Sequence, residues 1–119
     1  MKMKIKSVAI AATVAGIATL GVASPAQAAT GFDRCPEGRF CLFSQLNGQG
    51  TIAYFQWGAP DLRPYGVDGH AYSVWNRANR YFNVYSGYNY APLTSNSEPG
   101  DKSNIWDWVA KQIHSVRVR

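Results

Sequence analysis

Residues 40–47 read FCLFSQLN and residues 82–89 read FNVYSGYN, so one pattern returns after 42 positions. In both stretches a phenylalanine begins an apolar and aromatic run that ends at a serine, and an asparagine follows three residues later. Farther along the chain, Ser73-Val74 matches Ser115-Val116 at the same shift. Matches that keep to apolar, turn and hydroxyl positions indicate a structural repeat. We interpret the chain as two units, about residues 39–78 and 81–119.

Short strands are expected within each unit. Residues 40–43 and 81–85 are β-branched and aromatic runs that stop at polar or glycine-containing turns. Further strands are expected over residues 51–57, 72–75 and 114–119, the last of which alternates with a period of two. Two such units in tandem, each with long inner connections, predict an all-β sandwich of two Greek-key motifs.

Two local features refine this expectation. Ser73 and Ser115 occupy equivalent places, and each hydroxyl is expected to hydrogen-bond the folded-over hairpin of the partner unit. Within residues 105–113, Ile105, Trp108, Val109 and Gln112 follow an i, i+3, i+4, i+7 pattern, which predicts one short helical turn. Ser103 or Asn104 is the expected N-cap of that turn.

The first 28 residues have the features of an export signal. Three lysines precede an uncharged stretch of small and apolar residues over 7–23, and Ala26-Gln27-Ala28 is an A-x-A cleavage motif. A membrane anchor is the alternative, but the stretch is short and no cluster of charges follows it. The sequence therefore predicts a signal peptide over 1–28, one domain over 29–119, and a secreted product with no membrane association after cleavage.

The basic charge of the chain lies largely in this leader. Lys2, Lys4 and Lys6 account for three of the twelve Lys and Arg residues, so residues 29–119 keep nine basic against seven acidic residues and a net charge of +2 rather than +5. Nucleic-acid binding requires a concentrated basic face. The remaining close basic pairs, 77 with 80 and 117 with 119, are interpreted as solvated strand ends, and no nucleic-acid partner is expected.

Cys35 and Cys41 are the only cysteines of the chain. Export would place them in an oxidising compartment, so a disulfide is expected. The enclosed loop is short and closes little chain entropy, so its main effect is expected to be the pinning of the N-terminus onto the first strand. Free thiols and metal ligation are the alternatives, but two cysteines with no nearby histidine make a poor zinc site.

Four segments together resemble the peptidase inhibitor family I36. They are residues 35–43 (CPEGRFCLF), residues 72–77 (YSVWNR), Val84-Tyr85 with Asn89-Tyr90, and residues 115–118 (SVRV). That family consists of secreted actinobacterial proteins with a βγ-crystallin-like fold, and the resemblance covers essentially the whole chain after the leader. It implies a peptidase inhibitor, not an enzyme, whose partner is an extracellular metalloprotease of the thermolysin-like class.

A βγ-crystallin motif carries an aromatic residue, a second aromatic five residues later, a glycine two further on, and a serine in the last strand. In that order the first unit has Phe43, Gly48, Gly50 and Ser73, and the second unit has Tyr85, Tyr90, Pro92 and Ser115. Each unit departs once, because Gly48 replaces the second aromatic and Pro92 replaces the glycine. Proline cannot adopt the positive φ that glycine supplies, so the hairpin after Tyr90 must be reshaped.

Inhibitory members of the family present the reactive bond on a loop that a second small disulfide holds. The matching region here is residues 88–98, which contains no cysteine. The resemblance implies substrate-like insertion of this loop, with Pro92 supplying part of its rigidity. Thermolysin-like clefts favour a large apolar residue after the scissile bond, which points to Leu93. The predicted inhibitory loop consists of Tyr90, Ala91, Pro92, Leu93 and Thr94.

Metal and catalytic sites find little support. Many βγ-crystallins bind calcium through a loop of Asn, Asp, Ser and Thr residues, and residues 68–73 keep only Asp68 and Ser73 as candidates. Calcium prefers several oxygen ligands, so no metal or cofactor is expected. Asp68, His70 and Ser73 are not interpreted as a catalytic triad, because such sets are recognised by geometry rather than by proximity in sequence.

Two other functions stay open. If the abundant aromatic residues, Trp57 and Tyr88 among them, are exposed, they would suit an antimicrobial, killer-toxin-like protein or a cell-wall- or chitin-binding module. A crystallin-like structural domain with no dedicated target is the third possibility. In each case a monomer is expected.

Overall fold

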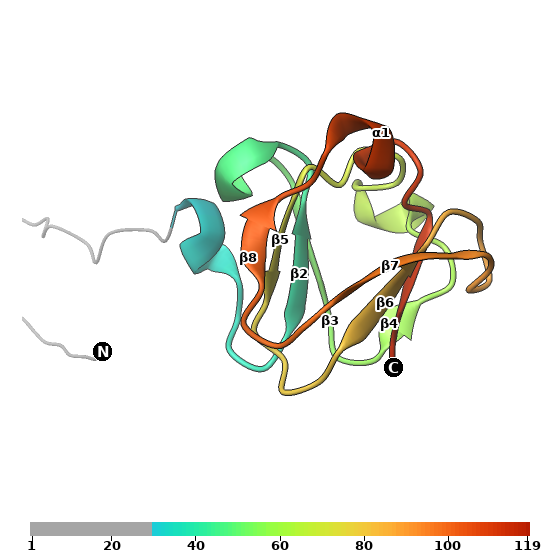
Figure 1. The fold of residues 1–119 in the computed structure, drawn as a ribbon. Coiled ribbons are helices and arrows are strands. Elements are labelled where there is room, and N and C mark those ends of the chain that lie inside the picture. The colour runs from blue at the N-terminus through green and yellow to red at the C-terminus, as the bar shows by residue number, and fades with distance from the viewer. Residues whose placement is uncertain (1–29) are drawn as a thin grey trace, which may run out of the picture.

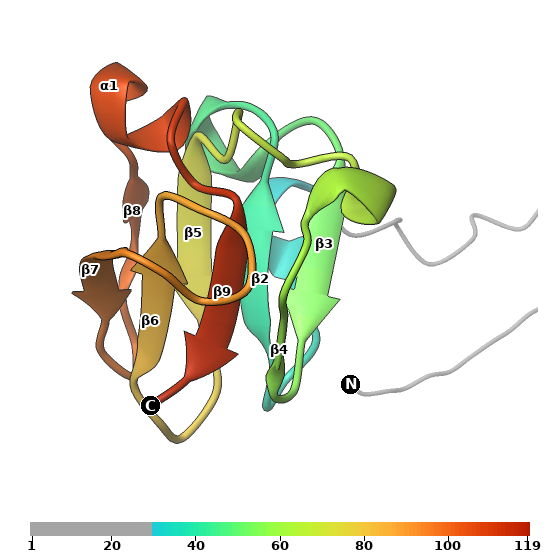
Figure 2. The ribbon, with the colours of Figure 1, turned by 90° about the vertical axis from the view of Figure 1, so that its right-hand side faces the viewer.

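The computed structural model describes residues 30–119, which form two antiparallel sheets packed face to face (Figures 1 and 2). The predicted signal peptide lies outside the described residues. The strands are β2 (Phe40–Phe43), β3 (Ile52–Phe55), β4 (Gly58–Ala59), β5 (Ser73–Asn76), β6 (Phe82–Tyr85), β7 (Leu93–Ser97), β8 (Lys102–Asn104) and β9 (Ser115–Val118). The helical elements are η2 (Gly31–Arg34), η3 (Leu46–Gly48), η4 (Arg63–Tyr65) and α1 (Asp107–Ala110).

Each sheet contains four strands, and the two units exchange one strand. The first sheet has the order β3-β2-β5-β8 and the second has the order β4-β9-β6-β7. Strand β4 therefore leaves the first unit to join the sheet of the second, and β8 makes the reciprocal move. This is the Greek-key sandwich that the repeat predicts, and neither sheet is complete without the other unit.

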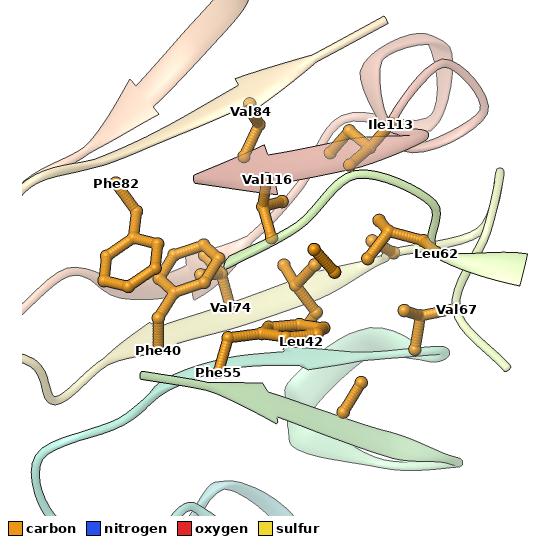
Figure 3. Packing of buried hydrophobic residues seen from close by; sticks show 13 residues of the cluster. Phe40, Leu42, Phe55, Leu62, Val67, Val74, Phe82, Val84, Ile113 and Val116 are labelled. Carbon is orange, nitrogen blue, oxygen red and sulfur yellow. The ribbon is translucent and has the colours of Figure 1, made fainter. Parts of the chain in front are cut away.

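Alternate residues of the central strands fill the space between the sheets (Figure 3). Phe40 and Leu42 face inward from β2, and Phe82 and Val84 occupy the equivalent positions in β6; all four are buried. The rings of Phe40 and Phe82 stack with centroids 4.5 Å apart. The 42-residue repeat of the sequence thus corresponds to equivalent side chains that meet in one core.

The Ser73 and Ser115 hydroxyls bind hairpins, but the hairpin in each case belongs to their own unit, so the expected contact with the partner unit is wrong. The Ser73 Oγ accepts the Gly48 N–H at 2.9 Å and donates to the Gln45 carbonyl at 2.6 Å. The β2–β3 connection folds back over its own unit, which brings these backbone groups to β5. The link between units is made instead by the exchanged strands β4 and β8.

The helical turn is present as α1, but its expected N-cap is wrong. The residue before α1 is Trp106, and no side chain caps the helix. Ser103 and Asn104 lie in β8, where they pair with β5. Their side chains are engaged elsewhere, because the Ser103 hydroxyl donates to Asp101 and the Asn104 amide donates to Asn47.

The N-terminal segment covers the outer face of the first sheet. The disulfide between Cys35 and Cys41 is confirmed, and it joins this segment to β2. The ring of Phe32 packs edge-on against Phe43 with centroids 5.3 Å apart. A Cβ on Gly48 would overlap the backbone of Phe32. Phe32 therefore occupies the space that the missing second aromatic of the motif leaves over Phe43, and only glycine fits beneath it.

This arrangement predicts a larger effect for Gly48→Ala than for Gly38→Ala. Both glycines have positive φ, at +69° and +81°, which disfavours alanine by about 1–2 kcal/mol at either position. A Cβ on Gly38 meets nothing within 4 Å, whereas one on Gly48 must displace Phe32 at a further cost of about 1–3 kcal/mol. Denaturant unfolding measures the free energy of unfolding of the two variants. An equal loss of stability in both variants would contradict the packing of Phe32 against Gly48.

Candidate functional site

The connection between β6 and β7, residues 86–92, is the candidate site and is called here the 86–92 loop. It passes in front of β9 in Figure 2, so the second sheet supports it from behind. Asn89, Ala91 and Pro92 are exposed, whereas Tyr88 and Tyr90 are half-buried. The two tyrosines therefore attach the loop to the domain. The exposed residues Asn89, Ala91 and Pro92 form its tip.

Tyr90 is held from three directions. Its N–H donates to the Ser115 Oγ at 3.1 Å, and that hydroxyl donates in turn to the Gly87 carbonyl at 2.6 Å. The ring packs edge-on against Tyr85 with centroids 5.8 Å apart, and the Arg117 guanidinium lies over it at 4.2 Å. A cation over an aromatic face is attracted by the ring quadrupole. These contacts fix a bulky residue whose φ of +67° is uncommon.

Tyr88 is held by a second set of side chains. Its hydroxyl donates to the Asp68 Oδ2 at 2.9 Å, and the His114 Nδ1 lies 2.7 Å from the Asp68 Oδ1. The ring lies 5.0 Å from the ring of His114 and 4.4 Å from the Arg63 guanidinium. The hydrogen bond to Asp68 is the main cause that raises the pKa of the Tyr88 phenol, with desolvation a smaller cause.

The Arg63 side chain is itself fixed. Its Nε and Nη2 bind the Asp61 carboxylate at 3.0 and 2.9 Å, a bidentate geometry that orients the guanidinium plane. The hydrogen bonds from Arg63 lower the pKa of the Asp61 carboxyl. The nearby Asn89 N–H donates to the Pro60 carbonyl at 2.9 Å. The segment that follows β4 therefore also supports the loop.

The backbone of the loop closes on itself. The Ser86 N–H donates to the Pro92 carbonyl at 3.0 Å, and the backbone at Gly87 approaches the Ala91 carbonyl so closely that a Cβ on Gly87 would overlap it. Asn89 and Tyr90 both adopt positive φ, and the Ala91–Pro92 peptide bond is cis. The hydrogen bond from Ser86 to Pro92 therefore closes the loop at Pro92.

The five residues of the predicted inhibitory loop lie next to one another but do not all belong to a loop. Tyr90, Ala91 and Pro92 lie in the 86–92 loop, whereas Leu93 and Thr94 begin β7, where Leu93 pairs with Tyr85. The sequence predicts a loop over residues 88–98 and no strand there. A register shift beside Tyr85 lets the ladder with β6 resume at Leu93. Leu93 is 59% exposed.

The other predicted residues divide between two places. Tyr85 and Ser115 lie beneath the 86–92 loop. In the first unit Gly50 lies in the equivalent hairpin between β2 and β3, whereas Phe43 lies in β2 and Ser73 in β5. The calcium candidates serve different contacts: Ser73 is fully buried beneath that hairpin, and Asp68 binds Tyr88 and His114. Among residues 30–119 no group of three or more His, Cys, Asp or Glu residues is placed to hold a metal ion.

Four side chains that support the 86–92 loop were not predicted from the sequence to do so. They are Arg63, Asp68, His114 and Arg117. Asp68 and His114 are 46 positions apart, and Asp68 drew attention only as a calcium or triad candidate. The sequence predicts only a solvated strand end at Arg117. The only sequence signal was the alternation of β9, which directs Ser115 and Arg117 to the same face as each other. That signal does not show that the 86–92 loop crosses this face.

Comparison with known proteins agrees with this architecture. Residues 28–95 match the model of the peptidase inhibitor family I36. The chain belongs to this family. Membership supports a protease inhibitor with a protease as partner, and it suggests a protein that is not an enzyme. A comparison with curated proteins gave no match.

Two solved structures have the same fold. A βγ-crystallin from Ciona intestinalis superimposes with a TM-score of 0.59 at 19% identity, over 69% of this chain and 100% of the other. A βγ-crystallin domain related to the evolution of the eye lens fold gives a TM-score of 0.62 at 18% identity, over 71% of this chain and 89% of the other. The I36 member therefore has a βγ-crystallin fold. No helix within residues 30–119 has the length and apolar character needed to cross a membrane.

The geometry predicts that Ser115→Ala loosens the 86–92 loop. The substitution leaves the Tyr90 N–H and the Gly87 carbonyl without their partner, so the free energy of unfolding should fall by about 1–3 kcal/mol. The exchange of the Tyr90 amide hydrogen with solvent should also accelerate. Ser73→Ala is the matched control, because it removes the same two bonds from the other hairpin and should leave Tyr90 protected. Equal exchange rates in the two variants would contradict this assignment.

The contribution of Tyr88 should depend on alkaline pH. The pKa of the Tyr88 phenol in the folded state lies above its ordinary value of about 10. The hydrogen bond to Asp68 therefore stabilises the folded state to its full extent below about pH 10. This contribution is lost as the pH rises through the folded-state pKa. The stability difference between the wild type and Tyr88→Phe should be constant near neutral pH and should shrink at alkaline pH. Urea unfolding across this range measures it. In an Asp68→Asn background most of this pH dependence should disappear. If the pH dependence persists there, a group other than Asp68 raises the pKa of Tyr88.

Proposed function

We propose that this protein inhibits a thermolysin-like metalloprotease by substrate-like insertion of the Ala91-Pro92-Leu93 tip into the catalytic cleft. The observation that carries the proposal is an exposed apolar residue, Leu93, directly after a loop that is fixed on both sides. Leu93 would occupy the subsite that follows the scissile bond. Catalysis is not part of the proposal: the domain binds a protease and blocks it.

The contacts of the 86–92 loop support such a mechanism without a second disulfide. A loop that is ordered before binding loses little conformational entropy when it binds, so more of the contact energy appears as affinity. That order is supplied here by the hydrogen bond from Ser115 to Gly87, by the hydrogen bond from Tyr88 to Asp68, and by the guanidinium groups of Arg63 and Arg117. The positive φ of Tyr90 adds to the argument, because sparsely populated backbone conformations concentrate at functional sites.

The cellular setting is part of the same proposal. The chain is exported, its leader is removed after Ala28, and the domain acts outside the cell as a monomer. The basis is the lysine-rich start, the apolar stretch and the A-x-A motif of the first 28 residues. An oxidising compartment is consistent with the disulfide between Cys35 and Cys41.

The test is titration of a thermolysin-like metalloprotease with the purified, oxidised domain. Stoichiometric inhibition is expected, and Leu93→Gly should weaken it by about 30-fold or more, as for the loss of a central apolar anchor. Leu46→Gly is the matched control, because Leu46 is an exposed leucine in the equivalent hairpin of the first unit. It should leave the inhibition constant unchanged.

Two outcomes would overturn the proposal. One is the absence of inhibition at micromolar concentration by a domain that unfolds cooperatively. The other is equal weakening by Leu93→Gly and Leu46→Gly. Retention of the non-inhibiting domain on insoluble chitin or peptidoglycan, lost in Trp57→Ala, would then favour the wall-binding function. Trp57 is suited to that measurement because its side chain is exposed, whereas Tyr88 is half-buried in the loop support.

A further inference from the structure

The two sheets are not closed along the edge where β7 and β8 lie. These strands are the last members of their sheets and lie on the same side of the sandwich (Figure 2). A groove of about 460 Å³ opens between them, and its floor consists of core residues that include Leu42, Val74, Val84 and Ile113. The volume is in the range of ligand-binding sites, and the floor is apolar.

The groove exists because serine occupies the positions where a sandwich needs large apolar side chains. Residues directly opposite in an antiparallel pair share a face. Ser95 lies opposite Val84, Ser97 lies opposite Phe82, and Ser103 lies opposite Val74. All three serines therefore face the groove from the two edge strands, where Ser97 is buried and Ser95 and Ser103 are exposed, and they are too small to cover the apolar floor.

The outer edge of β7 offers free backbone groups. Backbone groups of successive strand residues point alternately to the two neighbouring strands. Tyr81, directly before β6, accepts a hydrogen bond from the Arg119 N–H, which lies directly after β9. The odd-numbered residues of β6 therefore direct their backbone groups to β9, and the even-numbered residues direct theirs to β7. Phe82 and Val84 therefore bond Ser97 and Ser95, and the intervening Asn96 directs its N–H and C=O away from β6. No strand within residues 30–119 pairs with this edge.

The charge of the region selects an uncharged ligand. Strand β7 carries no charged residue and no proline, two devices that commonly protect a sheet edge. Asp101 is the one acidic residue that lines the groove, and its carboxylate accepts hydrogen bonds from Ser97 and Ser103. Trp106 and Trp108 also line the groove and are among the most exposed large apolar side chains.

We propose that an extended, uncharged segment of another polypeptide adds to the free edge of β7 and places alternate apolar side chains in the groove. Main-chain hydrogen bonds to Asn96 would hold such a segment, and the apolar floor would select its side chains, as in strand addition to sheet edges generally. Trp106 and Trp108 would cover the inserted side chains from the α1 side. This site adjoins the inhibitory tip at Leu93, the first residue of β7, but it is carried by other residues and does not depend on the proposed inhibition.

A second copy of the same chain is a poorer complement. If β7 of another copy paired with this edge, the inward positions of the added strand would again carry serines, and the apolar floor would stay uncovered. Strand β8 is no better, because it reads Lys-Ser-Asn. The groove therefore fits a strand that alternates apolar and polar residues, which neither edge strand supplies.

The experiment uses a capped, uncharged hexapeptide that alternates valine and threonine, with the oxidised domain labelled with ¹⁵N. Binding should shift the backbone amides of β7 and the indole N–H groups of Trp106 and Trp108. The same hexapeptide with N-methylated central amides is the control ligand and should not bind. Absence of saturable shifts in β7 at millimolar hexapeptide would overturn the proposal, as would equal binding of the N-methylated control.

Variants on the protein side separate the backbone edge from the groove. Asn96→Pro removes an N–H that points away from β6, so it leaves the pairing of β6 with β7 intact. The affinity for the hexapeptide should fall about tenfold or more. Asn96→Ala keeps this N–H and should bind the hexapeptide as the wild type does. Ser95→Leu should cover the floor, raise the Tm and abolish binding. A concentration-dependent dimer that Asn96→Pro abolishes would overturn the proposal in favour of self-pairing. Wild-type affinity in both Asn96→Pro and Ser95→Leu would place the hexapeptide elsewhere and overturn it as well.

Discussion

The stacking of Phe40 on Phe82 is the contact on which the domain depends. It joins equivalent residues of two units, at a centroid distance of 4.5 Å, in the middle of one shared core. Because β4 and β8 are exchanged, neither unit can complete its sheet alone, and the core forms only when both units are folded. A domain of about 90 residues has a modest core, so this mutual dependence and the short disulfide matter more than they would in a larger protein.

The same serine contact serves two purposes in the two units. In the first unit the Ser73 hydroxyl holds the hairpin that contains Gly48, and the space above it receives Phe32 from the N-terminal segment. In the second unit the Ser115 hydroxyl holds the 86–92 loop, and the aromatic residue of the motif, Tyr90, is supplied by the loop itself. One half of the repeat therefore anchors the N-terminus, and the other half presents an exposed tip that ends at Leu93.

The two surfaces that are open for binding differ in their physical character. The 86–92 loop is surrounded by charged groups, since Arg63, Arg117 and Asp68 contact its two tyrosines. The groove between β7 and β8 is nearly neutral, and its hydroxyls lie above an apolar floor. Because β7 begins at Leu93, the two surfaces are adjacent in the sequence, and the end of one is the start of the other.

Local periodicity and the spacing of a few residues such as Phe40, Phe82 and Ser115 were enough to predict the repeat, the Greek-key sandwich and the strands β2, β3, β5, β6 and β9, and two cysteines in an exported chain predicted the disulfide. Strands β4, β7 and β8 were not predicted, because they are short or polar and carry no clear apolar alternation. The sequence also indicated the segment that contains the exposed Leu93. The side chains that support that segment follow from the fold and not from any local pattern. Asp68, His114 and Arg117 come from distant parts of the chain, and their contacts arise from the way the loop crosses β9. The groove was equally invisible, since Ser95, Ser97 and Ser103 are ordinary strand residues until the register places them opposite Val84, Phe82 and Val74.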